Sequence, residues 1–110
     1  MRDAMLAVIL AIGMVPNACP MTIGVGRDGA FFSGRFSGWC KTSTKTLESD
    51  LRGGCYNDSN PSPVTSVELQ VASGAPQSRV DLVLSILEKE GWPKTKVSIG
   101  TWGDYPEKPR

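Results

Sequence analysis

The sequence predicts an α+β fold, a two-layer sandwich in which a small mixed sheet carries two helices on one face. Three observations predict it. An Asp-Gly turn near residue 28 joins two short strand-like segments, two amphipathic helical patterns follow, and a strand pattern comes after each helical pattern. The expected order is β-β-α-β-α-β. The chain has 110 residues, the size of one domain with a modest core.

The first two strands are expected to form a hairpin. Residues 21–25 place Met21, Ile23 and Val25 on one face. Residues 26–29 contain the Asp-Gly pair that hairpin turns favour, and residues 30–33 are the returning strand.

The first helix is expected over residues 42–52. Leu47 and Leu51 lie four residues apart and therefore share one face. The Gly53-Gly54 pair ends the helix. Residues 56–63 are rich in Asn, Asp, Ser and Pro, so we expect a loop there.

The second half of the chain has the clearest patterns. Residues 64–72 alternate apolar and polar side chains, as a strand with one buried face does. Residues 77–90 have helical spacing, and Gly91 and Pro93 prevent the helix from continuing. Residues 97–101 form the last strand, parallel to the strand before the helix. The apolar positions of that helix are Val80, Val83, Leu84 and Leu87.

The first nineteen residues are expected to be an export signal or a short membrane anchor. Arg2 precedes an apolar run over residues 4–15, and Pro16 and Pro20 end it. A helix of that length spans roughly 18 Å, whereas the hydrocarbon core of a bilayer is about 30 Å thick. A buried core segment is the third interpretation. Residues 20–103 are then the folded domain, and residues 104–110 a flexible tail.

Export would place the three cysteines in an oxidising compartment. Cys40 and Cys55 flank the first helix, and we expect them to form a disulfide. Cys19 is then lost with the signal, lipidated or left as a free thiol. If the chain stays in a reducing compartment, all the thiols stay unpaired.

Composition excludes several function classes. The chain has no histidine, so it holds no Ser-His-Asp or Cys-His catalytic arrangement and no His-ligated metal. Its formal net charge of +1 gives no electrostatic footprint for nucleic acid. Gly24, Gly26 and Gly29 precede a strand and not a helix, unlike a dinucleotide-binding loop. No nucleophile has a base beside it. We therefore expect a non-catalytic protein without cofactor or metal.

The pattern of elements resembles the periplasmic domain of the ExbD/TolR biopolymer-transport family. The matching pieces are residues 22–29 with the aromatic strand after them, residues 47–51, residues 67–71 and, most tellingly, residues 75–91. The resemblance covers residues 21–102. It implies an envelope domain that binds protein or cell-wall partners, forms a homodimer and works with an ExbB/TolQ-like membrane subunit in proton-motive-force-driven transport.

The resemblance also places Asp3 at the position of the family's proton-linked aspartate, at the start of the membrane helix. The other interpretation is that Asp3 is an ordinary charge at the start of a signal. The aromatic residues also have two interpretations: they form a partner surface, or they belong to the core. The candidates for a partner surface are Phe36, Trp39, Trp102 and Tyr105.

The alternative function is a secreted, disulfide-stabilised domain with an independent role, as an inhibitor or a small lytic enzyme. Such a domain would act on its own substrate or target. It would not need a membrane subunit.

Overall fold

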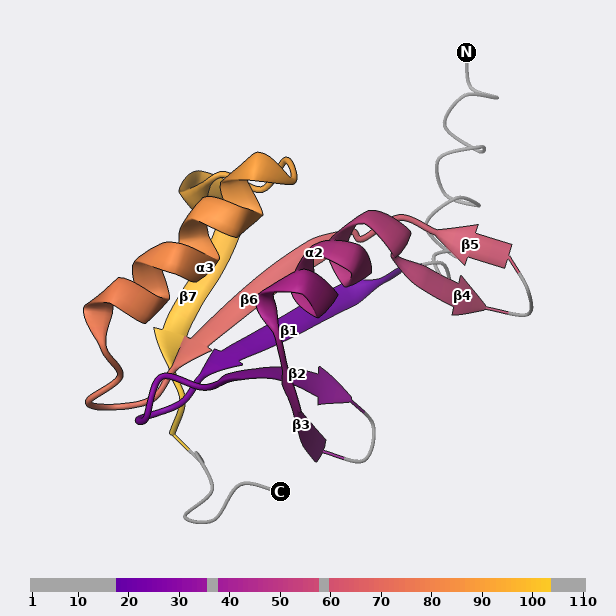
Figure 1. Cartoon of the computed structure of the whole chain (residues 1–110). Helices are drawn as coiled ribbons and strands as arrows, with labels where there is room; N and C mark the ends of the chain where they lie inside the picture. The colour runs from indigo at the N-terminus through magenta and orange to yellow at the C-terminus, as the bar shows by residue number, and fades with distance from the viewer. Residues whose placement is uncertain (1–17, 36–37, 58–59, 104–110) are drawn as a thin grey trace, which may run out of the picture.

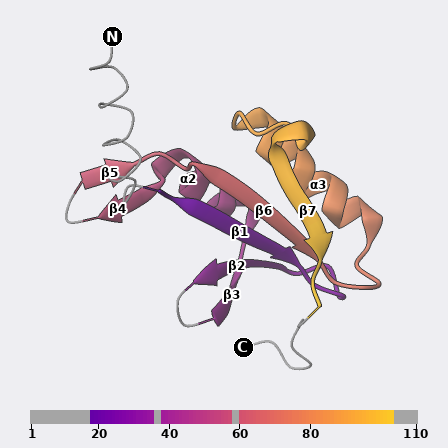
Figure 2. The ribbon, with the colours of Figure 1, turned by 180° about the vertical axis from the view of Figure 1, so that it is seen from behind.

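A computed structural model describes residues 18–35, 38–57 and 60–103 (Figure 1). Five strands form a mixed sheet with the order β3-β2-β1-β6-β7. Helices α2 (Thr44–Gly53) and α3 (Gln77–Lys89) cover one face of it. Figure 2 shows the opposite, helix-free side of the sheet. The structure confirms the expected α+β sandwich with both helices on one face.

The predicted hairpin is present and is longer than expected. Strands β1 (Pro20–Val25) and β2 (Phe31–Arg35) pair antiparallel. In the turn, the amide of Ala30 donates to the Asp28 carboxylate at 3.0 Å, and Gly29 has a φ of 90°. That backbone conformation explains why a glycine follows the aspartate.

An additional strand, β3 (Gly38–Thr42), pairs antiparallel with β2 and forms one margin of the sheet. This strand was not predicted, because glycines at positions 34 and 38 interrupt the apolar pattern that would have indicated it. The helix predicted to begin at residue 42 therefore begins two residues later. Ser43 caps it by accepting a hydrogen bond from the amide of Thr46 at 3.2 Å.

Strand β6 (Ser66–Val71) lies between β1 and β7 (Val97–Thr101) and is parallel to both. Helix α3 connects β6 to β7. It begins after Pro76, and Gly91, with a φ of 96°, follows its end. The last strand has the predicted bounds, preceded by one short 3-10 turn, η2 (Lys94–Lys96).

The main core fills the space between the helices and the sheet. Its central side chains, Ile23, Leu47, Leu69, Val83 and Leu87, are fully buried. Burying side chains of this size from water stabilises the fold by about 1.5–3 kcal/mol each. The predicted apolar faces of both helices and of β6 thus meet in one cluster.

The two helices are also joined by charged side chains at the surface. The guanidinium of Arg52 on α2 donates to the Glu90 carboxylate at 2.8 Å, and the Lys89 ammonium lies 2.9 Å from the Glu48 carboxylate. The hydrogen bonds from Arg52 lower the pKa of Glu90. These ion pairs fix the helix ends together, but exposed pairs add little to stability.

The segment expected to be a loop over residues 56–63 contains two short strands. Strands β4 (Cys55–Asn57) and β5 (Asn60–Ser62) pair antiparallel in a small separate sheet beside the end of α2. Strand β4 begins at Cys55, so the position of this small sheet determines where Cys55 lies.

Candidate functional site

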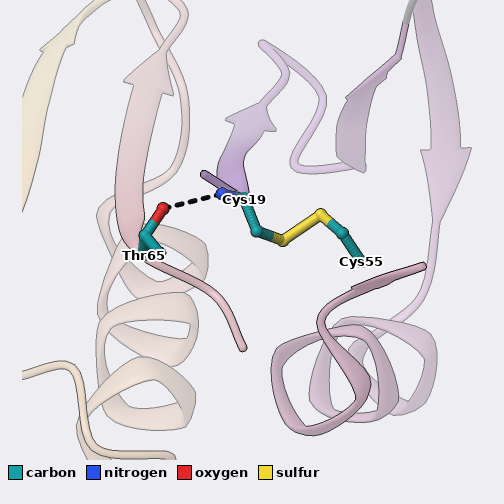
Figure 3. Close-up of a disulfide and its surroundings, with 3 residues drawn as sticks. All are labelled: Cys19, Cys55 and Thr65. Carbon is teal, nitrogen blue, oxygen red and sulfur yellow. Dashed lines mark hydrogen bonds between the residues drawn. A yellow bond between two sulfur atoms is a disulfide. The ribbon is translucent and has the colours of Figure 1, made fainter. Parts of the chain in front are cut away.

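The disulfide joins Cys19 to Cys55 (Figure 3), with 5.8 Å between the two Cα atoms. The predicted Cys40–Cys55 pair is therefore wrong, and Cys40 is an exposed free thiol. Cys19 lies directly before β1, where its amide donates to the Thr65 hydroxyl at 2.8 Å and its carbonyl accepts from the Thr65 amide. These bonds hold Cys19 at the end of the sheet where β4 begins.

The burial of Cys19 corrects its expected fate. Its side chain is 2% exposed and is bonded to Cys55, so Cys19 belongs to the folded domain. Cys55 is bonded to Cys19, whereas Cys40 stands on β3, the strand at the end of the five-stranded sheet, and β4 belongs to a separate sheet (Figure 1).

The bond indicates an oxidising compartment, since disulfides persist outside the reducing cytosol. Among the described residues, no helix combines the length and apolar character that crossing a membrane requires. The expected signal or anchor falls on residues 1–17, and Asp3, Phe36 and Tyr105 also lie outside the described residues.

Trp102 is buried and cannot present a ring to a partner. It is 2% exposed and lies on the helix-free face of the sheet, directly over Gly24. Its ring packs edge-on against Phe32, with 5.4 Å between centroids, and lies 4.2 Å from the ring centroid of Trp39. The expectation of an exposed Trp102 is thus wrong, because the chain after β7 folds onto the sheet. Trp39 remains partly exposed.

The helix-free face of the sheet therefore carries a small second core. Phe32, Ala72 and Trp102 form it, and Ala30 and Trp39 pack against it. For Trp102 the second interpretation of the aromatic residues, a place in the core, is the correct one, but the sequence did not show that there would be two separate clusters. The available signal was the alternation in β2, which sends Phe31 and Phe32 to opposite faces.

Within the described residues, β7 pairs with a strand on one side only, the side of β6. The amide of Trp102 donates to the carbonyl of Val71 on β6. In a parallel pair, alternate residues direct their backbone groups to the same side. Ser98 and Gly100 therefore face β6, whereas Ile99 and Thr101 direct their amides and carbonyls away from it.

The residues of β7 also lack the features that block strand pairing at an edge. The strand has no charge or proline between Val97 and Thr101, the devices that usually prevent edge pairing. All of its residues after Val97 are exposed, and Ile99, at 44%, is the most exposed large apolar side chain among the described residues.

A shallow polar hollow of about 370 Å³ lies between β3 and the start of α2. Thr42 Oγ1 is buried there and has no hydrogen-bond partner among the described residues. The lining contains hydroxyls, one thiol and one ammonium, but no carboxylate. It consists of Ser33, Cys40, Lys41, Thr42, Ser43 and Thr46.

No cluster of metal-ligating side chains occurs in the parts of the chain that the structure describes. Comparisons with protein-family models, with curated proteins and with solved structures found no match. Among the features of the described residues, the outer edge of β7 is the strongest candidate for a binding site.

Proposed function

We propose that this chain is an exported, non-catalytic interaction domain of the cell envelope, and that it binds a protein partner by adding a partner strand along β7. The main support for this proposal is that the backbone amides and carbonyls of Ile99 and Thr101 point away from β6, on a strand that contains no charged residue and no proline. An exposed edge of this kind is a template for an extended peptide.

The side chains of β7 suit such a partner. Main-chain hydrogen bonds supply affinity in strand addition, and side-chain contacts supply specificity. Ile99 offers an apolar contact at the middle of the edge. A partner strand with an apolar residue opposite Ile99 would remove that side chain from water.

The disulfide and the element order support the envelope part of the proposal. The Cys19–Cys55 bond indicates an oxidising compartment, and the periplasm is such a compartment. The order of elements is compatible with the proposed resemblance to the periplasmic domain of ExbD/TolR proteins. On that proposal the partner is an envelope protein or a cell-wall component, an ExbB/TolQ-like subunit energises the system, and Asp3 carries the proton.

The disulfide is equally compatible with the second candidate, a secreted domain that acts alone as an inhibitor or a small lytic enzyme. The two candidates differ in their dependence on β7. A strand-addition module loses its partner when the edge is blocked, whereas an independent inhibitor or enzyme keeps its activity on protein or cell-wall substrates.

The test blocks the edge without breaking the sheet. Thr101→Pro removes an outward amide, and proline is tolerated at an edge position of this kind. Thr101→Val keeps the amide and is the matched control. The tagged full-length variants are expressed in the native host, and co-purifying envelope proteins are quantified by mass spectrometry.

We expect at least one envelope protein to bind wild type and Thr101→Val equally and to fall at least tenfold with Thr101→Pro. Far-UV circular dichroism and the urea midpoint must be the same in all three chains. The same set of bound proteins in all three would refute the proposal.

A further inference from the structure

The sheet has a second open margin at β3, on the side opposite β7. Figures 1 and 2 show no described element beyond it. The ladder fixes which way its backbone faces. The amide of Gly26 donates to the carbonyl of Ala30, so the backbone groups of Ala30 face β1. Successive residues of a strand direct these groups to opposite sides, so those of Ser33, three residues later, face β3. Ser33 is paired with Cys40, whose backbone groups therefore face inward to β2.

It follows that Trp39 and Lys41, the neighbours of Cys40, direct their amides and carbonyls outward. The outer margin of β3 thus presents two hydrogen-bonding residues with the exposed thiol of Cys40 between them. The outward direction of these amides and carbonyls follows from the pairing of β3 with β2 and does not depend on the Cys40 side chain.

We propose that two copies of this chain pair antiparallel along β3, with the twofold axis at Cys40, and that a Cys40–Cys40 disulfide closes the dimer. The inference uses the margin opposite the proposed partner edge. It does not depend on β7, and requires only the oxidising compartment that the Cys19–Cys55 bond indicates.

Of the symmetric registers centred on residues 39, 40 and 41, only the one at Cys40 pairs both outward residues of β3 with each other inside the strand and avoids opposing lysines. Hydrogen-bonded pairs need outward residues opposite one another, so the axis can lie at residue 39, 40 or 41. An axis at Lys41 sets the two lysines directly opposite, which is unfavourable. An axis at Trp39 leaves the outward groups of Lys41 without a partner in the strand pair. An axis at Cys40 pairs each Trp39 with Lys41 of the second copy in both directions.

That register also places the thiols correctly for a bond. Cys40 and the Cys40 of the second copy form a non-hydrogen-bonded pair, in which Cα atoms are about 4.5 Å apart. This lies within the range of about 4.4–6.8 Å that disulfides span. Both side chains lie on the same face of the joined sheet, since directly opposite residues in antiparallel strands share a face.

The cross-strand neighbours are compatible too. Trp39 and Lys41 lie on the helix-free face, because they alternate with Cys40 along β3. In the dimer each Lys41 ammonium stands beside the partly exposed indole of the other copy's Trp39, and a cation over such a ring is attracted to it.

The covalent step is an oxidation. Two Cys40 thiols lose two protons and two electrons as one S–S bond forms. The electrons pass to the disulfide of a thiol-disulfide oxidoreductase, which is reduced to a dithiol and takes up two protons. The same class of oxidant serves the Cys19–Cys55 pair.

The first test is the intact mass of the native full chain. Free thiols are alkylated before the cells are broken, and the protein is analysed with and without reductant. We expect a main species of twice the reduced chain mass, with peptides linking Cys40 to Cys40. Cys40→Ser should abolish that species, and its far-UV circular dichroism spectrum should match that of the wild-type domain. A main species that is monomeric, with Cys40 alkylated or joined to a small thiol, would overturn the proposal.

The second test fixes the register in a Cys40→Ser background. Trp39→Cys and Lys41→Cys chains are mixed and oxidised with a glutathione redox buffer. We expect the mixed dimer to exceed either self-linked dimer at least tenfold, with circular dichroism verifying that both variants fold. Equal cross-linking in all combinations, or self-linking of Lys41→Cys alone, would overturn the register.

Discussion

Gly24 and Trp102 form the contact whose energetics the structure specifies most sharply. A Cβ at position 24 would lie 2.5 Å from Cζ3 of Trp102 and 3.0 Å from two further ring carbons. Gly24 has an ordinary strand conformation, so alanine would be excluded by the indole and not by the backbone. We expect Gly24→Ala to destabilise the domain by about 1–3 kcal/mol, the usual cost of overpacking.

The cost should vanish when the indole is removed. Trp102→Ala deletes a buried aromatic side chain and should itself cost about 3–5 kcal/mol. In that background Gly24→Ala meets no ring, and alanine in a strand is favoured over glycine by about 0.5–1 kcal/mol. The sign of the substitution therefore reverses.

The assay is urea unfolding followed by far-UV circular dichroism, for all four chains of the double-mutant cycle. Gly100→Ala is the matched control, because a Cβ there meets nothing within 4 Å. A Gly24→Ala cost that is the same with and without the indole would refute the placement of Trp102 on the sheet.

Three further outcomes follow from the structure. Cys55→Ser should lower the free energy of unfolding by about 4 kcal/mol, because the bond closes a loop with a sequence separation of 36. Cys40→Ser leaves that loop closed and should cost less, so the reverse ranking in urea unfolding would contradict the connectivity. Leu87→Ala should cost about 2–5 kcal/mol by the same assay, since its side chain is fully buried, and a loss below about 1 kcal/mol would contradict the packing of α3. Arg52 lowers the pKa of Glu90, so the pair stabilises the fold above the ordinary carboxyl pKa of 4.5 and loses that effect as the pH falls through the lowered value. Arg52→Gln should therefore make the urea midpoint fall less on acidification. A pH profile of the midpoint that is the same as in wild type would contradict the contact.

Periodicity predicted the elements whose side chains alternate clearly between core and solvent. The helix after Pro76 and the last strand were placed to within one residue, and the Asp28-Gly29 pair located the hairpin. Within the helix, Ile86 is buried with Val80, Val83 and Leu87, whereas Leu84 is only partly buried.

Long-range pairing was beyond the sequence pattern. Strand β3 gains its backbone hydrogen bonds from β2 and has no clear apolar period of its own. The disulfide partner was wrong because loop spacing alone favoured Cys40, whereas the start of β1 and the start of β4 bring Cys19 to Cys55. The burial of Trp102 depends on a glycine on β1, far away in the chain.

The candidate site, the outer edge of β7, was not predictable from the sequence. The sequence indicated a binding domain without catalytic groups and named aromatic residues as the surface. The open edge at Ile99 could not be recognised before the strand order was known, since a strand that ends the sequence can lie anywhere in a sheet.

The most direct test of the proposed function is photo-crosslinking in living cells from position 99. A photoreactive residue replaces Ile99 in the full chain, and Glu88, exposed on the outer side of α3, is the control position. We predict an adduct with an envelope protein from position 99, absent from position 88 and lost when Thr101→Pro is added. No adduct at position 99, or an adduct that Thr101→Pro leaves unchanged, would contradict strand addition along β7.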